Sequence, residues 1–344
     1  MASSRSRVAD LAHAAGVSTA TVDRVLHGRG NVRTATAQRV LRAAAALQYL
    51  PESDLWRALQ PSPMELAFLL PAGTNRYLRM LGDSVGAATA ALAPYNVRCR
   101  AHFIDSFDPQ RVAAALRRHG QRAQGVAFMA LEHPRVREAV DDLAERGVPV
   151  VTLISDLAPS RRVATVGIDN RAAGRTAATL IGRFLGPRRG PVAMIAGSLS
   201  YRGHEEREMG FIGLMREAFP QLQVVGVREG GDDAQTNYGQ ACALLRQHPD
   251  LVGLYNIGGG AEGVGRALQE RRGGERVVFV AHGLTPDTRA LLIDGTLDAV
   301  LNQHPQTMIL NTVRIFTNLR DGRSASAGVE PMRISIVLRE SLPG

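Results

Sequence analysis

The first fifty residues carry apolar side chains at helical spacing, interrupted by turn residues. Val8–Ala15 and Thr19–Leu26 have apolar residues three and four positions apart, and the short turn GVS joins these two segments. A third helical segment spans 34–47. This order predicts a helix-turn-helix with a supporting helix, in a domain of residues 1–50.

The turn decides which faces of these helices pack. Gly16 can end the first helix in the left-handed conformation, and Ser18 or Thr19 can cap the second. The apolar side chains that we expect to pack across the turn are Val22 and Val25 against Val8, Leu11 and Ala15. The side chains left facing outward are Thr19, Ala20, Asp23 and Arg24.

A short helix with this exposed N-terminal half fits the major groove of B-DNA. Arg24 can pair with guanine through two hydrogen bonds, and the methyl groups of Thr19 or Ala20 can contact thymine. The pattern predicts a DNA-binding head, with a three-helix bundle that has no DNA target as the alternative.

A linker follows at residues 51–63. Its segment ESDLWRALQ, at 52–60, reads as a short helix, and the Pro-Ser-Pro run at 61–63 ends it. A helix of this length is marginal alone, so we expect it to form when it docks on a partner, with a plain helical linker as the alternative.

From residue 64 onward, short apolar runs alternate with amphipathic stretches such as 77–92 and 109–119. Nearly continuous apolar runs are typical of parallel strands covered on both faces. The runs read MELAFLLP, RCRAHFID, GVAFMAL, VPVVTLIS, ATVGI, PVAMIAG, QVVGV, GLYNIG, RVVFVAHG and DAVLNQ. So many strands predict an α/β fold with two doubly wound parallel sheets.

Polar side chains come directly after many of these runs. Ligands of open α/β sheets bind beyond the carboxyl ends of the strands, so two facing sheets can enclose one cleft. A sugar needs flat rings for stacking and side chains that hydrogen-bond its hydroxyls, and this set mixes both. The ligand-binding candidates, each of which could instead be an exposed loop side chain, are Asn75, Arg76, Tyr77, Asp156, Tyr201, Arg207, Asp232, Asp233, Asn256, His282 and Gln303.

Composition describes a folded protein, 344 residues long, 45% hydrophobic and 21% charged, for which two or three domains are expected. All 41 basic residues are arginine, and the net charge is +9. Residues 1–60 hold eight arginines and four acids, and the other 284 residues hold 33 arginines and 28 acids. The denser positive charge of the N-terminal segment suits contact with phosphates. We expect Cys99 and Cys242 to be reduced, buried thiols.

No apolar run reaches the roughly 18 residues that a membrane span needs. The N-terminus MASSRSRVAD also lacks the apolar core of a signal peptide. We therefore expect a cytoplasmic protein with no membrane partner.

Enzyme signals are weak. The segment GGGAEG at 258–263 fits G-x-G-x-x-G, yet no acid follows the next strand, where a ribose would need one. We interpret its glycines as allowing close helix-sheet packing and leaving backbone N–H groups that face the cleft. HEE at 204–206 lacks the second histidine of a zinc protease, and GSLSY at 197–201 is not a nucleophile elbow. The sequence predicts no enzyme activity, cofactor or metal site.

The head reads VADLAHAAGVSTATVDRVLHGRG and continues with a helix that ends in ALQYLP. This segment resembles the LacI (lac repressor) family of bacterial transcription regulators. The resemblance implies that Thr19 and Ala20 read bases and that Arg24 makes a third contact. Asp23 stands where the family more often has Ser, and His27 where it usually has Asn. These departures bear on the phosphate contacts and the preferred operator.

The resemblance also implies that residues 51–63 are a hinge that folds on operator DNA and inserts a leucine into the minor groove. Leu59 is the expected wedge, with Leu55 and Trp56 as rivals. Arg33 is a further DNA-contact candidate.

Residues 64–344 resemble the periplasmic sugar-binding proteins. This resemblance implies an effector-binding and dimerisation domain. Its N-subdomain would be 64–167 with 305–327, and its C-subdomain 168–304 with 328–344. The pair DN at 169–170, followed by Gly174, matches the first crossover, and we interpret it as a structural cap and a packing glycine. The ligand candidates that match family positions are Asn75, Tyr77, Arg207 and Gln303. Gly283 differs from the family pattern, because the family commonly has an acid at this position that accepts hydrogen bonds from the ligand's hydroxyl groups.

These observations predict a transcriptional repressor that binds double-stranded operator DNA as a homodimer and is controlled by a sugar or sugar derivative. One helix-turn-helix reads few bases, so useful discrimination needs two copies. The alternatives are a solute-binding protein of a transporter and a dinucleotide-dependent oxidoreductase. No heptad repeat ends the sequence, so a tetramer made by a terminal coiled coil is not expected.

Overall fold

The computed structural model describes residues 7–26, 32, 34–47, 49, 63–105, 107–157, 159–271 and 276–342. The chain divides into two compact units, Met1–Pro63 and Met64–Gly344. The predicted linker helix, with Leu55, Trp56 and Leu59, lies outside the described residues.

The three predicted helices are present in the first unit. They are α1 (Val8–Ala15), α2 (Thr19–Leu26) and α3 (Thr34–Ala46). Gly16 ends α1 in the left-handed conformation, with φ 62° and ψ 43°. The Ser18 hydroxyl accepts a hydrogen bond from the Thr21 N–H at 3.2 Å and thereby caps α2.

The core of this unit corrects one detail of the predicted packing. Leu11, Ala15 and Val22 are buried together with side chains of α3, and Val25 packs against them. Val8, however, is 37% exposed, because it is the first residue of α1 and lies at the open end of the helix.

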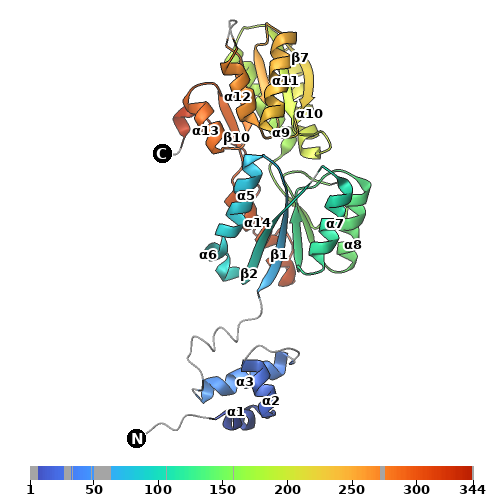
Figure 1. Cartoon of the computed structure of the whole chain (residues 1–344), viewed down its shortest axis with the longest axis vertical. Helices are drawn as coiled ribbons and strands as arrows, with labels where there is room; N and C mark the ends of the chain where they lie inside the picture. Colours follow the sequence, from blue (N-terminus) through green and yellow to red (C-terminus); the bar gives the residue numbers. More distant parts are fainter. Residues whose placement is uncertain are drawn as a thin grey trace. The chain divides into compact units, whose positions relative to one another are not determined.

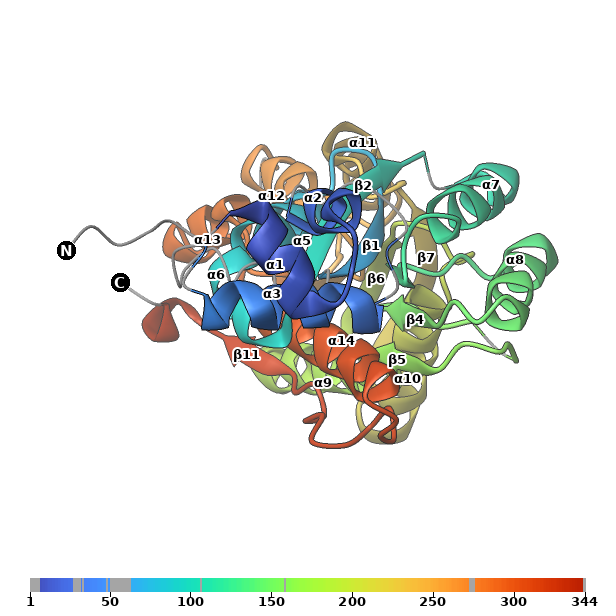
Figure 2. The same cartoon turned by 90° about the horizontal axis from the view of Figure 1, so that it is seen from below.

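The N-terminal sheet of the second unit is parallel throughout, with the strand order β2-β1-β3-β4-β5. Its strands are β1 (Met64–Pro71), β2 (Val97–Ile104), β3 (Gly125–Phe128), β4 (Val150–Leu153) and β5 (Ala164–Val166). Helices α7 (Pro109–Gly120) and α8 (Pro134–Glu145) cover one face, and α5 (Arg76–Ala87) and α14 (Pro305–Arg320) cover the other (Figures 1 and 2). The short helices α6 (Thr89–Leu92) and Ala93–Tyr95 lead into β2.

The C-terminal sheet has the order β11-β10-β9-β8-β6-β7, in which only β11 is antiparallel to its neighbour. Its strands are β6 (Gly190–Ala196), β7 (Leu222–Glu229), β8 (Gly253–Asn256), β9 (Val278–His282), β10 (Ala299–Asn302) and β11 (Ser335–Val337). Helices α9 (Asn170–Leu185) and α10 (Arg202–Ala218) cover one face. The other face carries α11 (Ala234–Gln247), α12 (Ala261–Gln269) and α13 (Pro286–Ile293), and a short turn, Arg339–Ser341, follows β11.

Each apolar run quoted above contains a strand, so the predicted α/β fold with two doubly wound sheets is confirmed, and β11 departs from the predicted parallel pairing. The chain passes between the sheets three times, after β5, after β10 and before β11. The carboxyl ends of both sheets therefore belong to one unit and can share a cleft.

The first residues after the crossover that follows β5 allow α9 and α10 to pack closely. The Asp169 carboxylate caps α9 by accepting a hydrogen bond from the Ala172 N–H at 2.8 Å. A Cβ added to Gly174 would lie 2.0 Å from the carbonyl oxygen of Arg207, so only glycine allows this approach. The cap and the packing glycine hold α10, and with it Arg207, against the sheet.

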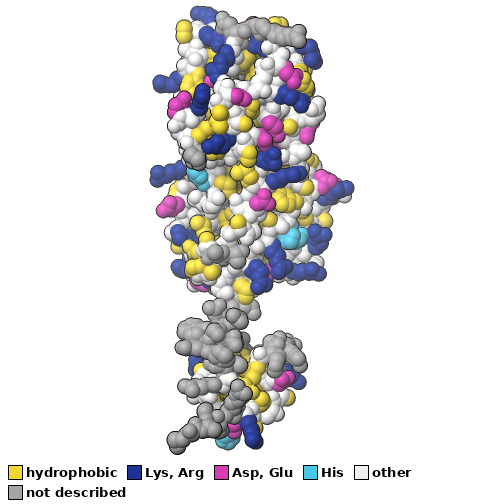
Figure 3. All heavy atoms as spheres, turned by 60° about the vertical axis from the view of Figure 1, so that its left-hand side comes forward, with side chains coloured by type: hydrophobic (Ala, Val, Ile, Leu, Met, Phe, Trp, Pro, Cys, Tyr) yellow, Lys and Arg dark blue, Asp and Glu magenta, His cyan; other side chains and the backbone are white. Residues whose placement is uncertain are grey.

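The surface of the second unit mixes charges. Figure 3 shows arginine side chains interspersed with acidic and apolar ones on the face that it draws. Cys99 and Cys242 are free thiols, but both are half-buried, which corrects the prediction that they are buried. Within the part of the chain that is described, no helix has the length and apolar character needed to cross a membrane.

Candidate functional site

A cleft of about 610 Å³, part of it open to solvent, lies at the carboxyl ends of strands from both sheets. Its volume suits a small metabolite. The lining residues come from the loops that follow β1, β3, β4, β7, β8, β9 and β10, from strands β9 and β10 themselves, and from α5, α10, α12 and α13. They are Asn75, Arg76, Tyr77, Leu78, Met129, Ile154, His204, Arg207, Asp232, Gly258, Gly259, Gly260, Ala261, Glu262, His282, Gly283, Thr285, Thr288, Leu301 and Gln303.

The end of the loop after β1 and the first two residues of α5 bond to the C-terminal side across this cleft. Four consecutive residues take part, each with a different partner. The contacts are Thr74 Oγ1 to Asp233 Oδ2 at 3.2 Å, Asn75 Nδ2 to Asp232 Oδ2 at 3.0 Å, Arg76 Nε to Asp287 Oδ2 at 3.1 Å, and Tyr77 OH to the Gln303 carbonyl at 3.1 Å. These contacts therefore hold the two sides of the cleft together.

Asp232 lies at the centre of these contacts. Its backbone has a left-handed φ of 57°, which turns the carboxylate back toward the ends of the strands. Oδ1 accepts a hydrogen bond from the Gly259 N–H at 2.7 Å, and Oδ2 accepts one from Asn75. A Cβ at Gly258 would lie 2.1 Å from Oδ1, so the glycine run lets this backbone approach the carboxylate. The interpretation of these glycines as a close-packing turn with N–H groups at the cleft agrees with this geometry.

Arg207, on α10, is the most deeply buried charge of the cleft, with 3% exposure. Its Nε donates to Asn170 Oδ1 and its Nη1 to the Ile257 carbonyl, both at 2.8 Å. Burial lowers the pKa of Arg207, and the neighbouring Tyr255 and Asp232 oppose the shift. A guanidinium stays protonated even so, and these two bonds fix its plane beside the ligand space.

His282 lines another wall of the cleft, and Tyr255 is buried behind it. The Tyr255 hydroxyl and His282 Nε2 are 2.6 Å apart, and Tyr255 stacks on Phe211 with centroids 5.0 Å apart. Burial lowers the pKa of His282 well below its ordinary value, and Arg207 adds to this shift, so the imidazole is neutral. A neutral ring fixed in this way can pack against the apolar face of a sugar.

Two acceptors in the cleft are incompletely satisfied. One has no donor among the described residues, and the other is poorly solvated. Gln303 is 6% exposed, and its Oε1 has no hydrogen-bond partner. Burial raises the pKa of Glu262, which reflects incomplete solvation of its carboxylate. A ligand with hydroxyl donors would satisfy both groups.

The structure brings most of the predicted ligand residues to this cleft. Seven of the eleven candidates line it, namely Asn75, Arg76, Tyr77, Arg207, Asp232, His282 and Gln303, whereas Asp233 bonds to Thr74 and is not part of the lining. Sequence reasoning missed His204, Glu262, Thr285 and Thr288, which lie one or two helical turns past the strand ends or at the start of a helix. The position of a helix N-terminus above a strand end is the signal that would have found Glu262.

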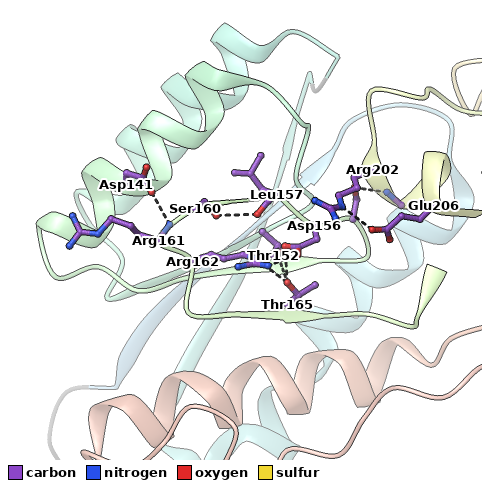
Figure 4. Close-up of polar contacts among 12 residues, drawn as sticks. Asp141, Thr152, Asp156, Leu157, Ser160, Arg161, Arg162, Thr165, Arg202 and Glu206 are labelled. Atoms are coloured by element: carbon purple, nitrogen blue, oxygen red, sulfur yellow. Dashed lines mark hydrogen bonds and ion pairs between the residues drawn. The ribbon is translucent and has the colours of Figure 1, made fainter. Parts of the chain in front are cut away.

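Asp156 does not reach the cleft lining. Figure 4 shows its carboxylate turned toward Arg162, Thr165 and Thr152, which belong to its own sheet or to the adjoining loop. Burial raises the pKa of Asp156, but the bonds from Arg162 and the two threonines outweigh burial and lower the pKa to about 2. Its paired environment is that of a structural ion pair.

Tyr201 and Asn256 also lie outside the lining. Tyr201 is 1% exposed, precedes α10, and packs edge-on against Phe107 with centroids 5.7 Å apart. Asn256 is fully buried and donates to the carbonyls of Gly258 and Gly259 at 2.8 and 3.0 Å. The strand-end rule placed both at the right edge, but local packing turns their side chains away from the ligand space.

The second helix of the N-terminal unit presents the predicted surface. Its four outward side chains, Thr19, Ala20, Asp23 and Arg24, are all exposed. His27, Arg33 and Leu59 lie outside the described residues. A helix exposed in this way, behind a capped turn, has the shape that enters a major groove.

Comparisons with known protein families divide the chain in the same two parts. Residues 7–52 match the family described as bacterial regulatory proteins, lacI family. Residues 66–324 match the family described as periplasmic binding protein domain.

Individual relatives are distant. Catabolite control protein A of Streptococcus mutans is 25% identical over 174 residues, which is 51% of this chain and 50% of that protein. The chain thus spans half the length of this relative. The HTH-type transcriptional repressor PurR of Vibrio vulnificus is 25% identical over 252 residues, 72% of this chain and 73% of PurR. The glucose-galactose binding protein GanP of Geobacillus stearothermophilus, a solved structure, superposes with a TM-score of 0.73 at 22% identity and covers 82% of this chain and 100% of that one. The last similarity establishes a shared fold.

Proposed function

The chain belongs to the lacI family of bacterial regulatory proteins and carries a periplasmic binding protein domain, and on that premise we propose that it is a repressor that binds operator DNA as a homodimer. A small, neutral, polyhydroxylated metabolite, such as a sugar or sugar derivative, would bind in the cleft and change its operator affinity.

The exposed face of α2 supports DNA binding. Thr19 and Ala20 begin the helix and Arg24 follows one turn later, so all three can reach base edges when the helix lies in a major groove. Two copies on a near-palindromic site would supply the discrimination that a single helix-turn-helix lacks.

The observation that carries the ligand proposal is the convergence of Arg207, Asp232 and Gln303 on one cleft of metabolite size. Arg207 is fixed by two hydrogen bonds, and Gln303 Oε1 has no partner within the described part of the chain, so the cleft offers an oriented donor and an acceptor for a ligand. The cationic lining residues, Arg76 and Arg207, are balanced by Asp232 and Glu262. A balanced cleft favours a neutral polar ligand over an ionic one.

Ligand binding would act through closure of the two sheets on one another. The β1–α5 loop already bonds to the far side, so a ligand that bonds to Asn75, Asp232 and Gln303 changes the relative free energy of closed and open forms. β1 follows the linker directly in the sequence, so this movement can reach the DNA-binding unit.

A solute-binding protein of a transporter is the second candidate, favoured by the fold shared with GanP. The match of residues 7–52 to the lacI family argues against it.

The test has two arms on the full chain. Selection from random oligonucleotides identifies the operator, and a thermal-shift screen of neutral sugars, sugar acids and amino acids identifies ligands. We expect a preferred near-palindrome, and a neutral sugar that both raises the melting temperature and changes operator affinity about tenfold or more. Absence of any sequence preference refutes the regulator, and stabilisation by charged compounds alone refutes the ligand class.

A further inference from the structure

A second groove opens on the N-terminal sheet, on the face covered by α7 and away from the ligand cleft. It encloses about 710 Å³, part of it open to solvent. None of its lining residues lines the cleft. They are Glu65, Leu66, Ala67, Arg100, His102, His119, Arg122 and Ala123.

Strand and helix geometry gather basic side chains at this groove. β2 is the edge strand of its sheet, and alternate residues point to the same face, so Arg98, Arg100 and His102 lie in one row. In the register of the sheet, Arg100 is opposite Ala67, whose small side chain leaves the space open. The last turn of α7 adds His119 beside this row, and the second residue after the helix adds Arg122.

The two imidazoles lie against each other. Their centroids are 4.1 Å apart, with 36° between the ring planes. The Nη2 atom of Arg118 lies 3.0 Å from His119 Nε2, and because arginine can only donate, Nε2 accepts and the proton of a neutral His119 is on Nδ1.

Negative charge is scarce around these rings. Glu65 is the single carboxylate among the described lining residues, and it is already bonded to Arg98 at 2.8 Å and 3.9 Å from Arg100. The charged and titratable groups that face the rings from β1, β2 and α7 are Glu65, Arg98, Arg100, His102, Arg118, His119 and Arg122.

This excess of positive charge affects the imidazoles. Burial, His102, Arg118 and Arg122 together lower the pKa of His119 to about 4, and burial with Arg118 and Arg100 lowers that of His102. Both rings are therefore neutral near neutral pH, and each becomes a further donor if an anion offsets the arginines.

We infer that this groove binds a phosphate group, held by Arg100 and Arg122 with the paired imidazoles of His102 and His119 as additional donors. Arginine forks match the oxygens of a phosphate, and the apolar floor formed by Leu66 and Ala67 leaves room for an attached organic part. The site is separate from the sugar cleft, so the protein would respond to a phosphorylated compound independently of the ligand proposed above.

Binding is measured on the full chain by calorimetry with inorganic phosphate, pyrophosphate and glucose 6-phosphate, and by the histidine side-chain NMR signals. We expect saturable binding of at least one probe, with the signals of His102 and His119 moving together. Tighter binding of inorganic phosphate identifies the free anion as the ligand, and tighter binding of glucose 6-phosphate identifies a phosphorylated metabolite.

The discriminating variant is Arg100→Gln with Arg122→Gln, and its matched control is Arg135→Gln with Arg146→Gln, which removes two exposed arginines at the ends of α8. We expect about tenfold or greater loss of affinity in the first pair and less than twofold in the second. No saturable binding of any probe, an equal loss in both variants, or histidine signals that do not move would overturn the inference.

Discussion

The Asn75 carboxamide donates a hydrogen bond of 3.0 Å to Oδ2 of Asp232, which lies 157 positions later in the chain and on the other side of the cleft. Asn75 also caps α5, because its Oδ1 accepts the Leu78 N–H at 3.2 Å. The Asn75 side chain thus caps a helix that packs on the N-terminal sheet, and it also bonds to a loop that follows a strand of the C-terminal sheet. The start of α5 and the closure of the cleft are therefore linked through a single residue.

This link predicts the effect of Asn75→Asp. Aspartate is as good a cap as asparagine, but it has no donor and places a second carboxylate beside Asp232. We expect the closed form to lose about 1–3 kcal/mol relative to the open form. Amide hydrogen exchange in the facing segments 74–78 and 258–262 should become faster.

Asn75→Ser is the control, because serine keeps the cap but introduces no charge. It should speed exchange less than Asn75→Asp does, because it places no second negative charge beside Asp232. Exchange in Asn75→Asp at the native rate would show that the bond to Asp232 does not hold the cleft closed.

Arg24→Ala should reduce affinity for the selected operator about 10- to 100-fold, since a bidentate contact with guanine contributes about 1–3 kcal/mol. Arg42→Ala removes the same charge from an exposed position of α3 and should cost about threefold or less. Fluorescence anisotropy at one fixed salt concentration makes the comparison. Equal losses in the two variants would assign Arg24 to general phosphate attraction.

Gly174→Ala should destabilise the second unit by about 2–3 kcal/mol. Its Cβ would meet the backbone carbonyl of Arg207 at 2.0 Å, and a backbone cannot rotate away as a side chain can. Gly213→Ala, on the exposed face of α10, meets nothing within 4 Å and should be neutral or stabilising, because alanine favours a helix. Urea unfolding measures both, and similar unfolding midpoints would contradict the close approach of α9 and α10.

Asp156→Asn should lower the free energy of unfolding at neutral pH by about 1 kcal/mol. The carboxylate is bonded to Arg162 and two threonines, but its side chain is 24% exposed, so solvent screens part of the gain. The pKa of Asp156 is lowered to about 2 in the folded protein, below its value in an unfolded chain.

The sign of the pH dependence follows from that direction. The contribution of Asp156 is present in full above the unfolded pKa of about 4 and is lost as the pH falls through about 2. The native protein and Asp156→Asn should therefore differ at about pH 7 and converge toward about pH 2. A difference in stability that stays constant over this range would exclude the ion pair as its cause.

Much of the fold could be predicted because its determinants are local. Gly16 and Ser18 end one helix and begin the next through bonds that span four residues or fewer, and the apolar run at 64–71 coincides with β1. Val8 is more exposed than predicted, because helical spacing identifies the buried face of a helix but not how far the neighbouring helix extends along that face.

The candidate site was only partly predictable. The rule that ligands bind at strand ends located the correct edge, and Arg207 and Gln303 lie in the cleft. It could not say that Asp156 turns toward Arg162, or that Asn256 bonds to the glycine loop, because those partners are set by packing between separate segments.

By itself, the sequence determined the three helices of the head, the order of the strands along the chain and the set of polar residues that follow them, because spacing, turns and caps act over a few positions. Only the tertiary structure decided which of those polar residues face one another. Asn75 meets Asp232, and His102 lies against His119, because crossovers and sheet register bring distant segments together, and no local pattern encodes such distances.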